Sequence, residues 1–164
     1  MPVFFVFGFV TSRAQGSNYA VQANIIFRFT KYIEWPAAKK TGDFLIGIVG
    51  DSPLNNELRN FTANKLAGTQ KIVVKSFSSN QETYDCHILF IVEEEGNSIR
   101  KITLRTAGDP ILIVTEMDGR SPEGSCINFS IVSDHLQLYI NKKNIDARSL
   151  GIASELLQLG ATSK

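Results

Sequence analysis

The chain has few of the residue types on which most catalytic and metal sites depend. Its 164 residues include only two histidines, two cysteines and one tryptophan. None of these residues stands at the C-x-x-C or H-x-x-x-H spacing of a metal motif. The phosphate-binding patterns G-x-x-x-x-G-K-[ST] and G-x-G-x-x-G are also absent. The sequence therefore predicts no metal, no cofactor and no catalytic residues, so we expect a protein that is not an enzyme.

An excess of charge of one sign is missing too. The chain has 17 basic and 16 acidic residues, for a formal net charge of +1. Proteins that bind nucleic acid usually carry a basic stripe with interleaved aromatic residues, and this chain shows none. Nucleic acid is therefore not an expected partner.

Long hydrophobic runs are absent. Residues 2–10 (PVFFVFGFV) form a nearly continuous apolar run, but a membrane-spanning helix needs about 20 residues. The run suits the apolar region of a signal peptide, with Ser12 and Ala14 as the small residues before a cut after Ala14. No lysine or arginine precedes it, so it is either a signal peptide truncated at its start or a buried N-terminal strand. The order of segments favours export, which leaves residues 15–164 as one domain that does not insert into a membrane.

The two cysteines, Cys86 and Cys126, both fall at the starts of expected strands. An even number of cysteines in an exported protein permits one disulfide, provided that the two Cα atoms lie within about 7 Å. Buried free cysteines that pack as small apolar side chains are common. We favour two free thiols, and the pair remains the only candidate for a disulfide or redox site.

The two histidines are expected to pack rather than to catalyse. His87 and His135 lie inside or beside apolar strands. Cys86 and His87 are neighbours in sequence, and neighbouring strand residues point to opposite faces, so they do not form a catalytic dyad.

Residues 21–36 (VQANIIFRFTKYIEWP) show the clearest helical pattern. Val21, Ile25, Phe29 and Ile33 recur every four residues, and Ile26 and Tyr32 widen this stripe, which predicts an amphipathic helix with the stripe on the core. Pro36 is expected to end the helix because it disfavours the helical conformation of the residue before it.

The following segments alternate between strands and helices. We expect strands at 44–49, 71–77, 86–92 and 111–115, and helices from Pro53 to about Leu66 and from Ser98 to about Thr106. Strands at 126–132 and 135–140 are separated by two polar residues, which predicts a hairpin. A final helical region at 142–159 is expected to break near residues 150–151. The sequence thus predicts a single three-layer α/β domain with flanking helices and a mixed, mostly parallel sheet that ends in an antiparallel hairpin.

A ligand site is expected, if anywhere, beyond the carboxyl ends of the strands. Five residues there are the candidates for binding a polar ligand: Asp51, Ser52, Glu93, Asp118 and Arg120. The alternative is that they are turn and helix-capping residues, and we favour this alternative because such positions select Asp, Ser and Gly.

The polar side of the first helix offers a second candidate surface. Arg28, Lys31 and Glu34 lie away from the apolar stripe. They are candidate contacts for a protein partner, and the alternative is an ordinary solvated helix face.

Read together, four segments of the chain resemble the YfiR family of small periplasmic proteins. They follow one another in the family's order and cover nearly all of residues 15–164. The segments are FTKYIEWP at 29–36, IGIVGDSP at 46–53, CHILFI at 86–91, and INF at 127–129 with LYIN at 138–141 and LGIASELLQL at 150–159.

The resemblance implies an exported α/β domain, commonly dimeric, that signals across the inner membrane and is not a catalyst. The best-known members hold a membrane-bound diguanylate cyclase inactive by binding its periplasmic sensor region, and redox or envelope stress releases it. Other family domains act with sensor kinases. Gly124-Ser125-Cys126 stands where the family tends toward Gly-Gly-Met. Members often have more cysteines than this chain, which speaks against redox sensing here.

Overall fold

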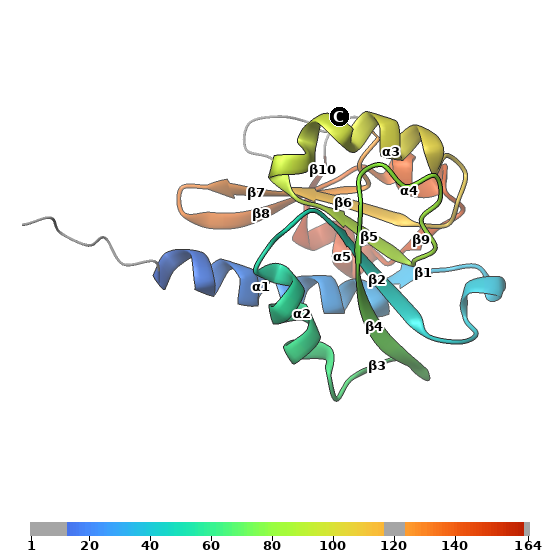
Figure 1. Ribbon diagram of the computed structural model, residues 1–164, viewed down its shortest axis with the longest axis horizontal. Helices are drawn as coiled ribbons and strands as arrows, with labels where there is room; N and C mark the ends of the chain where they lie inside the picture. The colour runs from blue at the N-terminus through green and yellow to red at the C-terminus, as the bar shows by residue number, and fades with distance from the viewer. Residues whose placement is uncertain (1–12, 117–123, 163–164) are drawn as a thin grey trace, which may run out of the picture.

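An eight-stranded mixed sheet runs through the middle of the molecule, in the order β10-β8-β7-β6-β5-β2-β4-β3 (Figure 1). The computed structural model describes residues 13–116 and 124–162. The strands are β2 (Phe44–Val49), β3 (Leu66–Ala67), β4 (Gln70–Phe77), β5 (Ile88–Ile91), β6 (Leu112–Glu116), β7 (Ile127–Val132), β8 (His135–Ile140) and β10 (Ala161–Thr162). The α/β fold predicted from the sequence is confirmed.

The central strands β4, β2, β5, β6 and β7 are parallel to one another. Every residue of β5 is buried, as expected for a strand covered on both faces. The predicted hairpin joins β7 to β8, and its two linking residues, Ser133 and Asp134, have φ angles of 51° and 62°. Two consecutive positive φ angles match a type I′ turn, whose twist suits a two-residue hairpin.

Helices cover both faces of this sheet, which gives the predicted three layers. Helices α1 and α2 lie on one face, and α3 and α4 lie on the other (Figure 1). None of the helices in the described part of the chain is long and apolar enough to cross a membrane. The helices are α1 (Arg13–Tyr32), α2 (Leu54–Thr62), α3 (Ile99–Arg105), α4 (Lys142–Asp146) and α5 (Ser154–Leu159), with 3-10 turns η1 (Ala37–Lys39) and η2 (Glu93–Ser98).

The side of helix α1 that packs on the sheet agrees with the predicted stripe at Ile26 and Phe29 and differs from it at Val21. Ala23, Ile26 and Phe29 are fully buried, whereas Val21 is 47% exposed. Val21 precedes Ile26 by five residues, which places it about 140° around the helix axis at 100° per residue. The prediction was therefore wrong at Val21. The Phe29 ring contacts that of Phe129 on β7, with centroids 6.1 Å apart.

The helix also ends earlier than expected, at Tyr32. The next two residues form β1 (Ile33–Glu34), which pairs antiparallel with β9 (Gly151–Ile152). This small second sheet ties the end of α1 to the C-terminal region. The expected helical region at 142–159 is accordingly split into α4, β9 and α5, with its break at the predicted place.

Leu66, which was expected to end a helix, and Leu104 and Leu159, which were expected on apolar helix faces, are exposed. Leu66, Leu104 and Leu159 are 56%, 68% and 63% exposed. Leu66 lies in β3, because α2 ends at Thr62. Leu104 and Leu159 lie near the ends of α3 and α5, and periodicity predicts the buried face of a helix better than it predicts the last turn.

Arg148, which follows α4, is a buried cation that the sequence did not single out. It is 5% exposed. Its guanidinium donates to the carbonyl oxygens of Thr106 (2.8 Å), Asp109 (3.4 Å) and Thr103 (3.4 Å). These carbonyls lie at the end of α3, where a helix leaves oxygens unpaired and favours positive charge. Arg148 therefore fastens α3 to the C-terminal part of the domain.

Candidate functional site

The carboxyl ends of β2, β5 and β6 meet at one edge of the sheet, as the predicted ligand site requires. Asp51 and Ser52 follow β2, and Glu93 follows β5; Asp118 and Arg120 lie outside the described residues. Asp51 and Glu93 are exposed. Ser52 is buried, and its Oγ accepts from the amide of Leu54 at 3.2 Å. Ser52 therefore caps the start of α2, which is the alternative that we favoured.

Glu116, the last residue of β6, is the centre of the polar contacts at this edge. Its carboxylate accepts from Nε2 of Gln22 on α1 (3.3 Å) and from the amide of Glu93 on η2 (3.4 Å). Burial raises the pKa of Glu116, and the nearby charges of Glu94 and Glu93 raise it further, while the two hydrogen bonds act in the opposite direction. Glu116 thus connects α1, β6 and η2.

Gln22 has an unusual place in α1. It is only 5% exposed, and its Oε1 is buried with no hydrogen-bond partner among the residues that the structure describes. A buried amide oxygen with no partner is costly. Sequence reasoning missed both Gln22 and Glu116. The sequence signal that could have identified Gln22 was its position next to Val21, a member of the predicted apolar stripe.

No group of three or more His, Cys, Asp or Glu side chains within residues 13–116 and 124–162 could hold a metal ion. At the carboxyl edge of the sheet, the Glu116 carboxylate connects α1, β6 and η2, whereas Asp51 and Glu93 are exposed.

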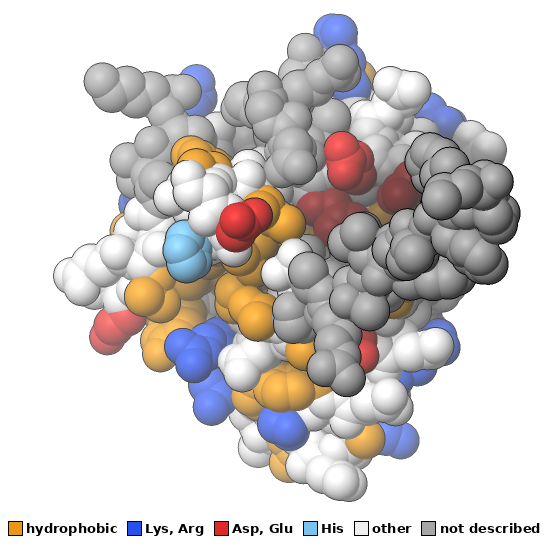
Figure 2. Space-filling view, turned by 90° about the vertical axis from the view of Figure 1, so that its left-hand side faces the viewer, with side chains coloured by type: hydrophobic (Ala, Val, Ile, Leu, Met, Phe, Trp, Pro, Cys, Tyr) orange, Lys and Arg blue, Asp and Glu red, His pale blue; other side chains and the backbone are white. Residues whose placement is uncertain are grey.

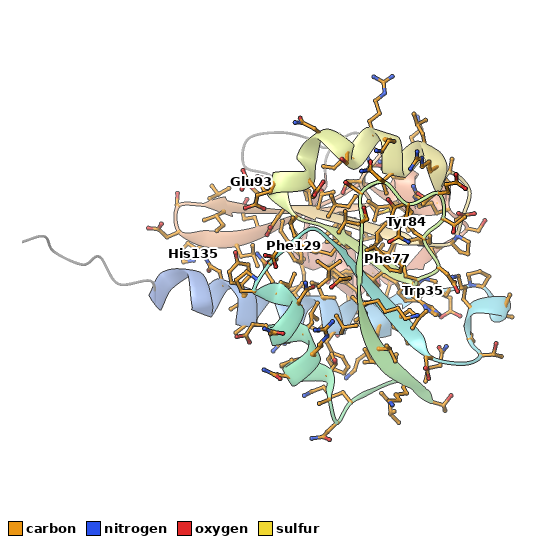
Figure 3. All side chains as sticks on the ribbon, viewed as in Figure 1. Trp35, Phe77, Tyr84, Glu93, Phe129 and His135 are labelled. Atoms are coloured by element: carbon orange, nitrogen blue, oxygen red, sulfur yellow. The ribbon has the colours of Figure 1, made fainter. Side chains whose placement is uncertain are left out.

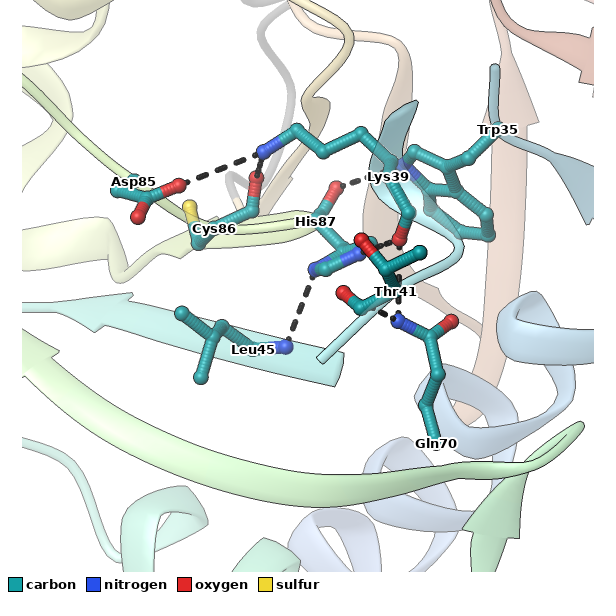
Figure 4. A network of polar contacts seen from close by, with 8 residues as sticks. All are labelled: Trp35, Lys39, Thr41, Leu45, Gln70, Asp85, Cys86 and His87. Carbon is teal, nitrogen blue, oxygen red and sulfur yellow. Dashed lines mark hydrogen bonds and ion pairs between the residues drawn. The ribbon is translucent and has the colours of Figure 1, made fainter. Parts of the chain in front are cut away.

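The opposite end of the sheet carries a second polar cluster, built around His87. Figure 3 shows Glu93 and Trp35 at opposite ends of the sheet. Nδ1 of His87 accepts from the amide of Leu45 at 3.1 Å, so Nε2 carries the proton and donates to the carbonyl of Lys39 at 2.7 Å (Figure 4). The backbone carbonyl of His87 accepts from Nε1 of Trp35 at 3.3 Å. One residue thereby connects β2, η1 and the residue after β1.

Aromatic rings enclose the His87 imidazole. The Phe44 ring stacks on it with centroids 4.2 Å apart, and Trp35 meets it edge-on at 6.0 Å. His87 is 4% exposed. Burial lowers the pKa of His87, and so does the charge of Lys39; the hydrogen bond to the Lys39 carbonyl and the charge of Asp85 partly offset this. The imidazole is therefore a neutral structural group, which agrees with the packing role predicted for it.

A shallow pocket of about 390 Å³ opens beside His87. Leu45, Val73 and His87 contribute to its lining, together with charged side chains that include Lys39 and Asp85. Nζ of Lys39 donates to the carbonyl of Cys86 at 3.0 Å and lies 3.5 Å from the Asp85 carboxylate. Both ring nitrogens of His87 and the ammonium of Lys39 are thus already engaged in internal contacts, whereas Asp43 and Lys75 also line the pocket.

Both cysteines are free and fully buried. Burial raises the pKa of Cys86 to about 12, and burial also raises the pKa of Cys126. Only the thiolate is nucleophilic, so these thiols are unreactive in the folded domain. The structure agrees with two free thiols rather than a bridge.

Comparison with protein families gives the decisive observation. A family model described as YfiR/HmsC-like matches residues 19–161, which include all of the large sheet except Thr162 and all of α1 from Tyr19 onward. The chain belongs to the YfiR/HmsC-like family. No curated protein matches it. Membership of the YfiR/HmsC-like family indicates a regulatory, non-catalytic domain with a periplasmic role in cyclic-di-GMP signalling. The resemblance stated from the motifs is confirmed.

The residues predicted to contact a partner of this YfiR/HmsC-like domain fall into two places. Arg28 and Lys31 lie together on the exposed side of α1. Glu34 lies beyond the end of the helix in β1, where its carboxylate pairs with Lys40. The expectation of one helical surface is therefore correct for Arg28 and Lys31 and wrong for Glu34.

Proposed function

We propose that this protein is a periplasmic regulator that binds the extracytoplasmic region of a membrane-anchored signalling enzyme and restrains it. The enzyme is a diguanylate cyclase or a sensor kinase, so that binding changes cyclic-di-GMP levels. The family match over residues 19–161 carries the proposal. The proposal includes export with a signal peptide cut near Ala14 and a homodimeric state, both implied by the sequence and its resemblance.

The chemistry of the domain supports a binding role. Nucleophilic and acid–base catalysis need a reactive group held beside a partner that activates it. His87 and Lys39 are engaged in internal hydrogen bonds, and the thiol of Cys86 is buried. The exposed surface of the domain is therefore the part that we expect to act, by binding a partner.

Affinity capture from whole cells tests the proposal. The chain is tagged at its C-terminus, crosslinked in living cells and purified with membrane proteins retained, and its partners are identified by mass spectrometry. We expect an inner-membrane protein with a cyclase or kinase domain, and we expect cellular cyclic-di-GMP to change when the gene is deleted. Capture of soluble periplasmic proteins alone, with unchanged cyclic-di-GMP, would contradict the proposal.

One observation favours a second function, the binding of a small polar solute. Oε1 of Gln22 is buried without a partner at the carboxyl edge of the sheet, where open α/β sheets bind ligands. A thermal-shift screen of amino acids, nucleotides and divalent cations tests it. A rise in melting temperature that is lost in Gln22→Leu would support solute binding, and no shift with any compound would count against it.

A further inference from the structure

Helices α1 and α2 together present a surface on which basic side chains surround two half-buried aromatic rings. Phe27, Arg28 and Lys31 follow one another at helical spacings of one, three and four residues on α1. Phe61 near the end of α2 packs against Phe27, with ring centroids 5.8 Å apart and planes at 66°. Lys65 follows α2 by three residues. We define the basic–aromatic face as these five residues: Phe27, Arg28, Lys31, Phe61 and Lys65.

The lysines of the basic–aromatic face are placed over the rings. Nζ of Lys65 lies 4.1 Å from the Phe61 centroid and 5.9 Å from that of Phe27. Nζ of Lys31 lies 5.2 Å from the Phe27 centroid. Cation–π contacts of this kind hold long side chains in place at about 0.5–1 kcal/mol each when exposed. The face is therefore partly ordered before anything binds to it.

The cations of this face have no carboxylate partners within the described part of the chain. The ion pairs there join Lys39 to Asp85, Lys40 to Glu34 and Lys142 to Asp146, all elsewhere on the molecule. Nε of Arg28 donates to Oδ1 of Asn24 at 3.2 Å, and Nζ of Lys65 donates to the Phe61 carbonyl at 2.7 Å.

The one nearby acid on α2 does not neutralise these cations. Glu57 stands one turn before Phe61 and pairs with none of them. Figure 2, which views the molecule from the left-hand side of Figure 1, shows basic side chains beside apolar ones in its lower part and most of the acidic side chains higher up. In a chain of net charge +1, this is a local excess of positive charge.

We propose that the basic–aromatic face docks an acidic segment of the partner protein, whose carboxylates meet Arg28, Lys31 and Lys65 while an apolar side chain covers Phe27 and Phe61. This inference rests on the proposed function and adds which surface binds and the charge of what it binds. Complementary charge raises association rates and excludes wrong partners, and aromatic residues with arginine are typical of binding hot spots.

A lipid surface fits these residues less well than a protein segment. Each basic residue near an anionic membrane contributes about 1 kcal/mol, so three supply about 3 kcal/mol. Micromolar binding needs about 8 kcal/mol. Both rings are half-buried, so little apolar surface protrudes to insert between headgroups.

Site-specific photo-crosslinking in living cells tests the inference. A photoreactive amino acid replaces Asn24, which adjoins Arg28 on the exposed side of α1, or, as a matched control, exposed Lys143 on α4. We expect position 24, and not position 143, to crosslink to an acidic peptide of a membrane-anchored signalling enzyme. Crosslinking to phospholipid, to a peptide without net negative charge, or from position 143 only would overturn the inference.

Charge reversal gives the second measurement. We expect Arg28→Glu with Lys31→Glu to weaken binding of the captured enzyme's purified extracytoplasmic region at least tenfold, and Lys71→Glu with Lys143→Glu to change it less than twofold. Circular dichroism and melting temperature confirm folding of each variant. If both pairs bind like the wild type, the face is not the docking site, although the proposed function stands; if no signalling enzyme is captured at all, the proposed function itself fails.

Discussion

His87 allows a quantitative test of how the amino end of the sheet is held together. Replacing it with alanine removes the acceptor for the Leu45 amide, which lies 3.1 Å from Nδ1. The Lys39 carbonyl loses its bond from Nε2 but keeps one from Nε2 of Gln70 at 3.0 Å. The Leu45 amide therefore loses its hydrogen bond, whereas the Lys39 carbonyl keeps one.

The expected loss of stability follows from these contacts. An unpaired buried amide costs about 1–3 kcal/mol. The imidazole also stacks on Phe44 and meets Trp35, and aromatic contacts of this kind contribute about 0.5–1.5 kcal/mol each beyond simple burial. We expect His87→Ala to lower the free energy of unfolding by about 3 kcal/mol, which is a large part of the 5–15 kcal/mol typical of a domain.

The same side chain makes stability depend on pH. Because burial lowers the pKa of His87, the unfolded chain takes up a proton that the folded chain refuses. The stability that neutral His87 contributes is therefore fully present above the ordinary histidine pKa of about 6.5. Below that pH the free energy of unfolding falls until the pH reaches the pKa of His87 in the folded protein, by at most about 1.4 kcal/mol per pH unit. His87→Gln should remove this component.

Urea unfolding at several pH values, followed by the fluorescence of the single tryptophan, Trp35, measures both effects. Trp35 lies 6.0 Å from the His87 ring and reports on this cluster directly. His135→Ala is the matched control because His135 is exposed in the hairpin, and we expect it to change stability by less than about 0.5 kcal/mol. The reasoning is refuted if His87→Ala costs no more than this control, or if His87→Gln retains the wild-type pH dependence.

Three further predictions follow from buried groups. Glu116→Gln should raise the melting temperature at about pH 8 and have little effect near pH 4.5, because burial raises the pKa of Glu116 and so penalises only its charged form; an equal effect at both pH values would contradict this. Arg148→Met should cost about 2–4 kcal/mol in urea unfolding because it removes the bonds of the buried guanidinium to the carbonyls of Thr106 and Thr103, and Arg148→Lys should cost less; a neutral Arg148→Met would show that these bonds contribute nothing net. Cys86 and Cys126 should react with a thiol reagent only on unfolding, since a pKa near 12 rather than 9.0 leaves Cys86 with about a thousandfold less thiolate; fast labelling of the native protein would refute their burial.

Periodicity and turn chemistry predicted the class of fold and the longer strands, but not the two-residue strands β1, β3, β9 and β10. Phe44–Val49 is apolar throughout because both its faces are covered, and Ser133 and Asp134 form the two-residue turn that the hairpin needs. The family resemblance was also available, because the segments ending in Trp35-Pro36 and opening with Cys86-His87 stand in a specific order.

The sequence could not predict contacts that depend on tertiary packing. The stripe of α1 was misplaced at Val21 because several apolar spacings fit one helix, and only the sheet decides which of them is buried. The bonds of Arg148 join residues about 40 positions apart, and those of Gln22 join residues 94 apart. The pairing of Phe27 with Phe61 across two helices likewise required the fold.

The most direct test of the account measures the activity of the captured signalling enzyme, reconstituted in lipid nanodiscs, as purified protein is added. The account predicts that the enzyme's rate falls with increasing wild-type protein, and that Arg28→Glu with Lys31→Glu needs at least tenfold more protein for the same effect. A rate unchanged by saturating wild-type protein would contradict the regulatory role.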